Sequence, residues 1–219
     1  VDLVFYERLV AWAKENKVWI LSDLAYSELY FDGNPTPSIL QVKGAKEIAI
    51  EFTSLSKTYS MAGWRIGFAV GNKQLIAAMT RVKSYLDYGA FTPIQAAACA
   101  ALNGPQDIVE NNRQLYHKRR DVLVEAFGRS GWDIPPPRAS MFAWAPLPPA
   151  LAHLGSLEFS KQLLTHAKVA VAPGVGYGED GEGFVRIAMV ENEHRLRQAA
   201  RNVRKYLQSM GVNTGAKTA

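Results

Sequence analysis

The stretch SLSKTYSMAGWRIG, residues 54–67, combines a lysine, an arginine, several hydroxyl groups and two glycines in one short connection. Apolar-rich runs flank it at residues 47–52 and 66–70, and both runs are predicted strands. A third strand is predicted at residues 18–21, after a helix marked by apolar residues at helical spacing. Short apolar strands that alternate with helices predict a parallel or mixed sheet covered on both faces.

Beyond this connection, the pattern continues with helices at residues 73–87 and 92–102. Asn103-Gly104-Pro105 ends one helix and begins a long one that runs to about Gly128. A smaller α+β unit is predicted from about Pro105 onward. Its further strands are expected at residues 139–144, 169–172 and 184–190, and its helices at residues 156–168, opened by a Ser156 cap, and 193–210.

Composition places the chain among globular proteins and argues against several other classes. It has 219 residues, of which 48% are hydrophobic and 21% charged, so a sizeable core is available. One cysteine excludes a disulfide framework and suits a reducing compartment, which favours a cytoplasmic protein. No apolar run is long enough for a membrane helix, and no signal peptide is visible. The four histidines lack the spacing of metal ligands.

The net charge of +5 raises the possibility of a basic nucleic-acid-binding module. From Arg195 to the end, however, the chain has six Lys or Arg residues and no acid, so the excess lies at the C-terminal end, five of the six in the last predicted helix. Such a helix is usually a solvated face, and no aromatic residues are interleaved with the charges. We therefore expect no nucleic acid partner.

Polar side chains follow the predicted strands at their carboxyl ends, where α/β sheets bind ligands. Each has an ordinary explanation when taken alone: a loop lysine is solvated, an aspartate caps a helical turn, and an arginine forms a surface ion pair. Six of them, together with an arginine inside the predicted strand 184–190, nevertheless occur in a specific order and spacing along the chain. They are Asp23, Tyr26, Ser54, Ser56, Lys57, Arg65 and Arg186.

This order resembles the class I and II aminotransferases of fold type I, which use pyridoxal 5′-phosphate (PLP). The resemblance extends from residue 1 to about residue 210, and residues 54–67 carry most of it. Residues 84–95, SYLDYGAFTPIQ, look most like bacterial alanine (glutamate–pyruvate) transaminases and LL-diaminopimelate aminotransferases. The resemblance to this family implies an α/β fold. The chain would contain part of the PLP-binding large domain, with a mixed, mostly parallel sheet, followed by a smaller α+β domain. The expected divisions are 1–104, 105–211 and a flexible tail at 212–219.

The resemblance also implies roles for three side chains around the cofactor ring. Lys57 would hold PLP as a Schiff base and, once released by an amino-acid substrate, would move a proton between substrate Cα and cofactor C4′. Asp23 would keep the ring nitrogen protonated, and Tyr26 would hydrogen-bond the ring oxygen. These three residues are the expected catalytic groups and also cofactor ligands.

The remaining expected ligands bind anions. Arg65 would bind the cofactor phosphate together with the hydroxyl groups of Ser54 and Ser56, because a guanidinium fork matches phosphate oxygens. Arg186 would bind the α-carboxylate of the substrate and orient its Cα–H bond. Alanine is the expected donor and 2-oxoglutarate the expected acceptor, because residues 87–91 contain no second arginine of the kind that dicarboxylate-specific relatives use. Aspartate, methionine and diaminopimelate stay open as donors.

Three other features receive ordinary interpretations. Residues 176–181 match the dinucleotide-binding pattern G-x-G-x-x-G, but a strand is predicted after them where that motif needs a helix. Residues 33–37 differ from the family's Asn-Pro-Thr-Gly turn and are taken as an ordinary turn. Cys99 is interpreted as a small buried residue.

The sequence lacks the first half of the family's pattern, including the turn whose helix N-terminus receives the phosphate. We therefore expect the C-terminal portion of a longer enzyme, which binds PLP weakly and has little activity alone. When complete, it is expected to form a homodimer. The alternatives are a PLP-dependent carbon–sulfur lyase, an aminocyclopropane-carboxylate synthase type of enzyme, or the effector domain of a transcription regulator with an aminotransferase-like fold.

Overall fold

The computed structural model describes residues 1–212 and residue 214. Contacts divide the chain into two units, Val1–Arg113 and Gln114–Ala219, and each is described by itself. The boundary falls within the long helix α5 (Asp107–Gly128).

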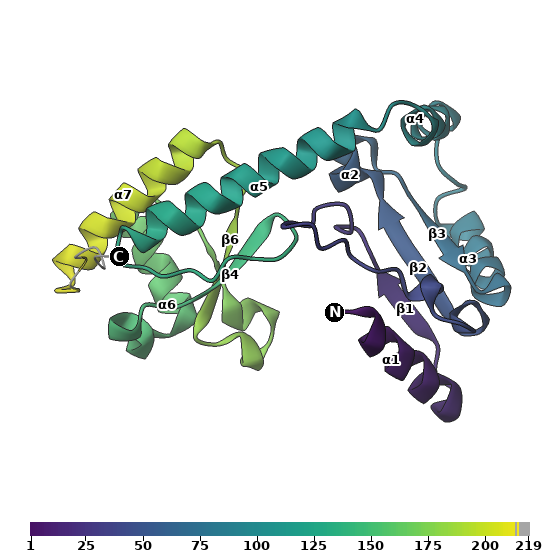
Figure 1. Cartoon of the computed structure of the whole chain (residues 1–219), viewed down its shortest axis with the longest axis horizontal. Coiled ribbons are helices and arrows are strands. Elements are labelled where there is room, and N and C mark those ends of the chain that lie inside the picture. The colour runs from purple at the N-terminus through teal and green to yellow at the C-terminus, as the bar shows by residue number, and fades with distance from the viewer. Residues whose placement is uncertain (213, 215–219) are drawn as a thin grey trace. The chain divides into compact units, whose positions relative to one another are not determined.

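The first unit contains a three-stranded mixed sheet in the order β1-β2-β3 (Figure 1). Its strands are β1 (Ile20–Asp23), β2 (Ala49–Ser54) and β3 (Gly67–Gly71). β1 and β2 are parallel, with Asp23 opposite Phe52, whereas β2 and β3 are antiparallel, with Ser54 opposite Gly67. The three strands predicted in this region are therefore present, and residues 55–66 form the connection within an antiparallel pair.

Helix α1 (Leu3–Asn16) covers one face of this sheet. Asp2 caps it by accepting a hydrogen bond from the Phe5 amide, and Lys17 ends it in a left-handed conformation. Its buried residues recur at helical spacing and pack against the first two strands and the segment between them. This cluster consists of Tyr6, Val10, Ala13, Ile20, Ile39, Ala45 and Ala49.

The expected cover on the other face is incomplete in the described residues. Side chains alternate along β1, so Ile20 and Ser22 are buried, while Leu21 is 69% exposed and Asp23 is exposed. No residue of helix α3 (Lys73–Leu86) is buried. Helix α3 contacts β2 and β3, but Leu21 on β1 is exposed, so the sheet cover predicted for both faces is partial in the described residues.

Three further helices complete the first unit: the single turn α2 (Leu55–Thr58), α4 (Thr92–Asn103) and the start of α5. Only Ala98 is buried in α4. Cys99 is exposed, which contradicts its predicted burial. Because Cys99 follows Ala98 directly, it points away from the side on which α4 is packed.

The second unit contains an antiparallel sheet in the order β4-β6-β5. Its elements are β4 (Phe142–Pro146), α6 (Gly155–Gln162), β5 (Ala172–Pro173), β6 (Phe184–Ala188) and α7 (Glu193–Ser209). The strand expected at residues 169–172 is confined to Ala172 and Pro173, because only these residues pair with β6. Strand β6 follows the glycine-rich loop at residues 176–181, where a dinucleotide-binding motif would need a helix.

Aromatic rings form the core of this unit. Trp132 is 1% exposed and makes edge-to-face contacts with Phe127 and Phe159. Its indole nitrogen donates to the Pro146 carbonyl at 2.8 Å, so the buried polar atom is satisfied. α7 buries the apolar face of its helix and exposes its five basic residues, which is the solvated face that the sequence predicts.

The start of α6 is stabilised by a residue far along the chain. Ser156 does not cap the helix, contrary to the prediction, because its position is already inside the first turn. The carboxylate of Glu182 accepts hydrogen bonds from the Ser156 amide, the Ser156 hydroxyl and the Gly183 amide. The Gly183 and Ser156 amides, followed by the Ser156 hydroxyl, lower the pKa of Glu182 below its ordinary value of 4.5.

The charge of Glu182 should therefore stabilise the folded state at neutral pH. A carboxyl group with a lowered pKa contributes stability above its ordinary pKa and loses that contribution as the pH falls through the folded value. Glu182→Gln is expected to lower the Tm at pH 7, and the difference from wild type should shrink below pH 4.5. Glu179→Gln, in the same exposed loop, is the control. An equal Tm difference at both pH values would contradict this.

The predicted tail at 212–219 lies mostly outside the described residues. Thr214, which is described, is 3% exposed, and its hydroxyl accepts a hydrogen bond from Gln208 at 2.9 Å. Among the described residues, no helix is long and apolar enough to cross a bilayer.

Candidate active site

The carboxyl ends of the two parallel strands meet at one edge of the first sheet. Asp23 is the last residue of β1, and Ser54 is the last residue of β2. Because side chains alternate along strands and Asp23 lies opposite Phe52, Asp23 and Ser54 project from the same face. Asp23 is exposed, and its Oδ1 atom accepts a hydrogen bond from the Ala25 amide at 3.0 Å. Its carboxylate is therefore held at the sheet edge.

Lys57 lies directly beyond this edge on α2. Ser54 begins that turn by accepting a hydrogen bond from the Ser56 amide at 3.2 Å. Lys57 is half-buried, and its Nζ atom lies 5.7 Å from the ring centroid of Tyr26, in the loop after β1. The amine and the phenol ring thus come from different loops and approach each other.

The side chains of Ser54, Ser56 and Arg65 line one open hollow of about 420 Å³. Arg65 Nη1 lies 3.4 Å from the Ser56 hydroxyl and 3.2 Å from the Ala62 carbonyl, and it donates to both. Among the described residues, no carboxylate forms an ion pair with Arg65. A guanidinium beside two hydroxyl groups, with no acid to neutralise it, is suited to bind an anion.

Backbone conformation at two positions shapes the connection that carries Arg65. Arg65 is in the left-handed region with φ 52°, which turns the chain back toward β2. Gly67 then pairs with Ser54, and a Cβ atom at residue 67 would lie 2.4 Å from the Thr53 carbonyl oxygen. Glycine is therefore required at 67 by the close approach of the two strands.

Arg186 belongs to the second unit, in the middle of β6. It lies opposite Trp144 on one side and Ala172 on the other. Its guanidinium carbon is 4.2 Å from the ring centroid of Phe142 and 4.8 Å from that of Tyr177. Among the described residues, no carboxylate forms an ion pair with Arg186. The aromatic rings hold the guanidinium plane and leave its donors available for a carboxylate.

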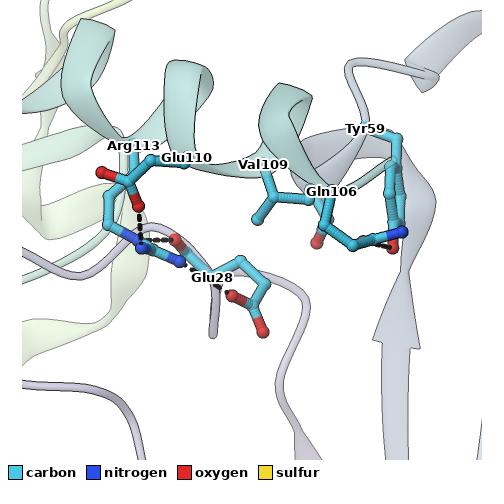
Figure 2. A pocket seen from close by; sticks show the side chains of 7 residues that line it. Glu28, Tyr59, Gln106, Val109, Glu110 and Arg113 are labelled. Atoms are coloured by element: carbon cyan, nitrogen blue, oxygen red, sulfur yellow. Dashed lines mark hydrogen bonds and ion pairs between the residues drawn. The ribbon is translucent and has the colours of Figure 1, made fainter. Parts of the chain in front are cut away.

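The structure thus brings six of the seven predicted residues to one sheet edge in the first unit, and it places Arg186 in the second. It also identifies two residues that the sequence did not indicate, Asn112 and Arg113 on α5, which bind the loops that carry Lys57 and Tyr26. Figure 2 shows Arg113 beside Glu28. These contacts span 54 and 85 residues of sequence, so no local pattern could reveal them. The described residues contain no cluster of His, Cys, Asp and Glu suited to a metal ion.

Three curated proteins are similar to nearly all of this chain. "Putative aminotransferase AatC" of Rhizobium meliloti (strain 1021) is 61% identical over 94% of the chain, and glutamate-pyruvate aminotransferase AlaC of Escherichia coli (strain K12) is 50% identical over 97%. LL-diaminopimelate aminotransferase of Moorella thermoacetica is 42% identical over 94%. The chain spans about half the length of these relatives, 51% or 52% in each case.

A solved structure shows the same fold. Substrate-bound BacF from Bacillus subtilis matches with a TM-score of 0.89 at 36% identity, over 94% of this chain and 52% of that one. The family described as aminotransferase class I and II matches residues 1–203. This match covers the first unit, most of the second and all seven residues of the predicted site, so the chain belongs to the class I and II aminotransferase family.

Proposed function

We propose that this chain is the cofactor-carrying portion of a PLP-dependent aminotransferase, with an L-amino acid such as alanine as donor and 2-oxoglutarate as acceptor. The observation that carries the proposal is the convergence of Asp23, Lys57 and an anion-binding hollow at one sheet edge. Because the chain spans about half of its relatives, we assign the activity to a longer protein and expect little activity from this stretch alone.

The side chains at this edge match the chemical groups of PLP, the cofactor of class I and II aminotransferases. PLP supplies an aldehyde that combines reversibly with amines and a pyridine ring that accepts electrons released at the substrate Cα. A lysine amine would bind the aldehyde, and a carboxylate would face the ring nitrogen. A phenol would donate to the ring oxygen, and Arg65 with two serine hydroxyls would hold the phosphate. Within the part of the chain that the structure describes, no acid forms an ion pair with Arg65, which supports this fit.

Each residue has a defined task in the proposed reaction. The amine of Lys57 would hold the aldehyde of the cofactor and, when free, would take a proton from the substrate Cα. The negative charge of Asp23 would favour a proton on the ring nitrogen. Tyr26, whose ring centroid lies 5.7 Å from Lys57 Nζ, would hydrogen-bond the ring oxygen of the cofactor.

Arg186 is the proposed binding group for the substrate α-carboxylate. Its fork can bind two carboxylate oxygens at once, and the rings of Phe142 and Tyr177 restrict its rotation. A fixed guanidinium orients the substrate as well as binding it.

The proposal also includes domain boundaries after residues 104 and 211, and a homodimer located in the cytoplasm. The single cysteine is consistent with a reducing compartment.

Alanine is favoured as donor because a 50% identical relative is named glutamate-pyruvate aminotransferase. The name of another relative supports diaminopimelate as the competing donor. No arginine occurs in residues 87–91, where dicarboxylate-specific members of the family place one, which supports a small donor side chain.

The proposal predicts which products the full-length protein forms. With PLP, alanine and 2-oxoglutarate, we expect pyruvate and glutamate in equal amounts, and faster turnover than with aspartate, methionine or diaminopimelate. Coupled enzyme assays for both products measure this. Formation of pyruvate and ammonia from cysteine without glutamate would indicate a carbon–sulfur lyase instead. Absence of turnover with every donor would contradict the assignment and favour the regulator alternative.

A further inference from the structure

The first turns of α5 contact both loops of the candidate active site. Asn112 is 8% exposed, and its Nδ2 atom donates to the Thr58 carbonyl at 3.0 Å. Thr58 directly follows Lys57 and is itself buried. Because α2 has only four residues, its carbonyl groups have few partners within the turn and its conformation depends on outside contacts. Asn112 supplies such a contact next to Lys57.

The neighbouring residue on α5 binds the other loop. Arg113 Nη2 forms an ion pair with Glu28 Oε2 at 3.1 Å, and Arg113 Nε donates to the Glu28 carbonyl, also at 3.1 Å. The guanidinium carbon lies 4.0 Å from the ring centroid of Tyr30, and Arg113 also pairs with Glu110. The Arg113 side chain is only 18% exposed, so these contacts are partly shielded from water. Glu28 lies two residues after Tyr26.

A third contact strengthens the same arrangement. The Tyr59 hydroxyl donates to Gln106 Oε1 at 2.8 Å, and Gln106 Nε2 donates to the Gly104 carbonyl at 2.7 Å. Figure 2 shows Gln106 and Arg113 at two ends of one pocket of about 370 Å³, with Tyr59 and Glu28 facing them. Residues 58 and 59 are therefore attached to the beginning of α5 at two points.

We propose that Asn112 and Arg113 are positioning residues, which hold Lys57 at its working distance from Tyr26. This inference rests on the proposed function of Lys57 and Tyr26. Neither Asn112 nor Arg113 touches the reacting groups. They act because adjacent positions on one rigid helix hold the Lys57 turn and the Tyr26 loop together. Loss of either contact lets the 5.7 Å separation change, and proton transfer is sensitive to such displacements.

The separation between Lys57 and Tyr26 should also affect the visible absorption spectrum of the PLP-loaded protein. The visible absorption of lysine-bound PLP depends on whether the nitrogen that joins lysine to the cofactor carries a proton. The pH at which this nitrogen loses its proton depends on a nearby phenol. A change in position should therefore shift the pH midpoint of the absorption. A residue that only stabilises the fold would lower the Tm and leave this midpoint and the turnover per bound PLP unchanged.

The test compares Asn112→Ala with Asn111→Ala in the full-length protein loaded with PLP. Asn111 is the adjacent, exposed asparagine and serves as the matched control. We expect Asn112→Ala to keep PLP on Lys57, to shift the absorption midpoint, and to lower kcat per bound PLP by about 10- to 100-fold with little change in KM. The control should match wild type. Equal midpoints and equal kcat per bound PLP in the two variants would overturn the proposal.

A second variant keeps the test decisive if Asn112→Ala fails to fold. Arg113→Lys retains the positive charge and loses the fork to Glu28 and the planar contact with Tyr30. We expect a shift of the midpoint and a smaller decrease in kcat, and a wild-type spectrum and kcat would again overturn the proposal. Failure of the proposed function gives a different result, because the wild-type protein would then show no transaminase activity.

Discussion

Replacing Lys57 with alanine is expected to abolish the covalent attachment of PLP and to lower transaminase turnover by at least about 10⁴-fold. The reason is that, in the proposed function, one amine has two tasks: it holds the cofactor and moves the proton at the substrate Cα. Lys57 is half-buried, and its Nζ atom lies 5.7 Å from the ring centroid of Tyr26. Borohydride reduction followed by mass spectrometry measures the attachment, and steady-state kinetics with alanine measure the turnover.

Lys46→Ala is the matched control, because Lys46 is an exposed lysine in the same unit. This variant should retain the wild-type adduct and rate. A reducible PLP adduct on another lysine of the Lys57→Ala protein, together with turnover, would disprove the assignment of Lys57.

Asp23→Asn is expected to retain PLP and to lower kcat by about 10²- to 10³-fold. Asparagine has nearly the same shape, and its oxygen can still accept the hydrogen bond from the Ala25 amide. The substitution therefore removes the negative charge and leaves the local backbone contact in place. Without that charge the ring nitrogen holds its proton less well, and the electrons released at Cα are less stabilised. The measurements are PLP content by absorbance and kcat with alanine and 2-oxoglutarate.

Glu15→Gln provides the comparison for Asp23→Asn, since it removes one negative charge from an exposed position on α1. Its kcat should equal that of wild type. An Asp23→Asn protein with unimpaired kcat would show that the carboxylate has no role in accepting those electrons.

The sequence predicted elements best where the local signal was strong. The helix expected at residues 73–87 is α3, Lys73–Leu86, because Asn72 caps its start and apolar residues recur at helical spacing. Of the strand expected at 169–172, only Ala172 pairs with β6, together with the next residue, Pro173. Pairing depends on where β6 lies and not on the apolar character of the segment. Cys99 was placed wrongly because its small apolar neighbours do not reveal which side of α4 is packed.

Some residues of the candidate site could likewise be predicted from the sequence, and others could not. The types and spacing of Lys57 and Arg65 were visible because they lie within one short stretch between paired strands. The contacts of Asn112 and Arg113 were not visible, because they join segments 54 and 85 residues apart, and their residue types are common on helices. Only the folded chain shows which helix holds the two loops.

The antiparallel pairing of β2 and β3 has a consequence for how the site assembles. Residues 54 and 67 close a local loop, whereas β1 joins β2 from about 29 residues away in the chain. Closing a short loop costs less chain entropy than closing a long one, and contacts between near neighbours in sequence form quickly. The hydroxyls and the guanidinium of the proposed phosphate cradle can therefore meet early during folding, before the strand that brings the carboxylate has docked.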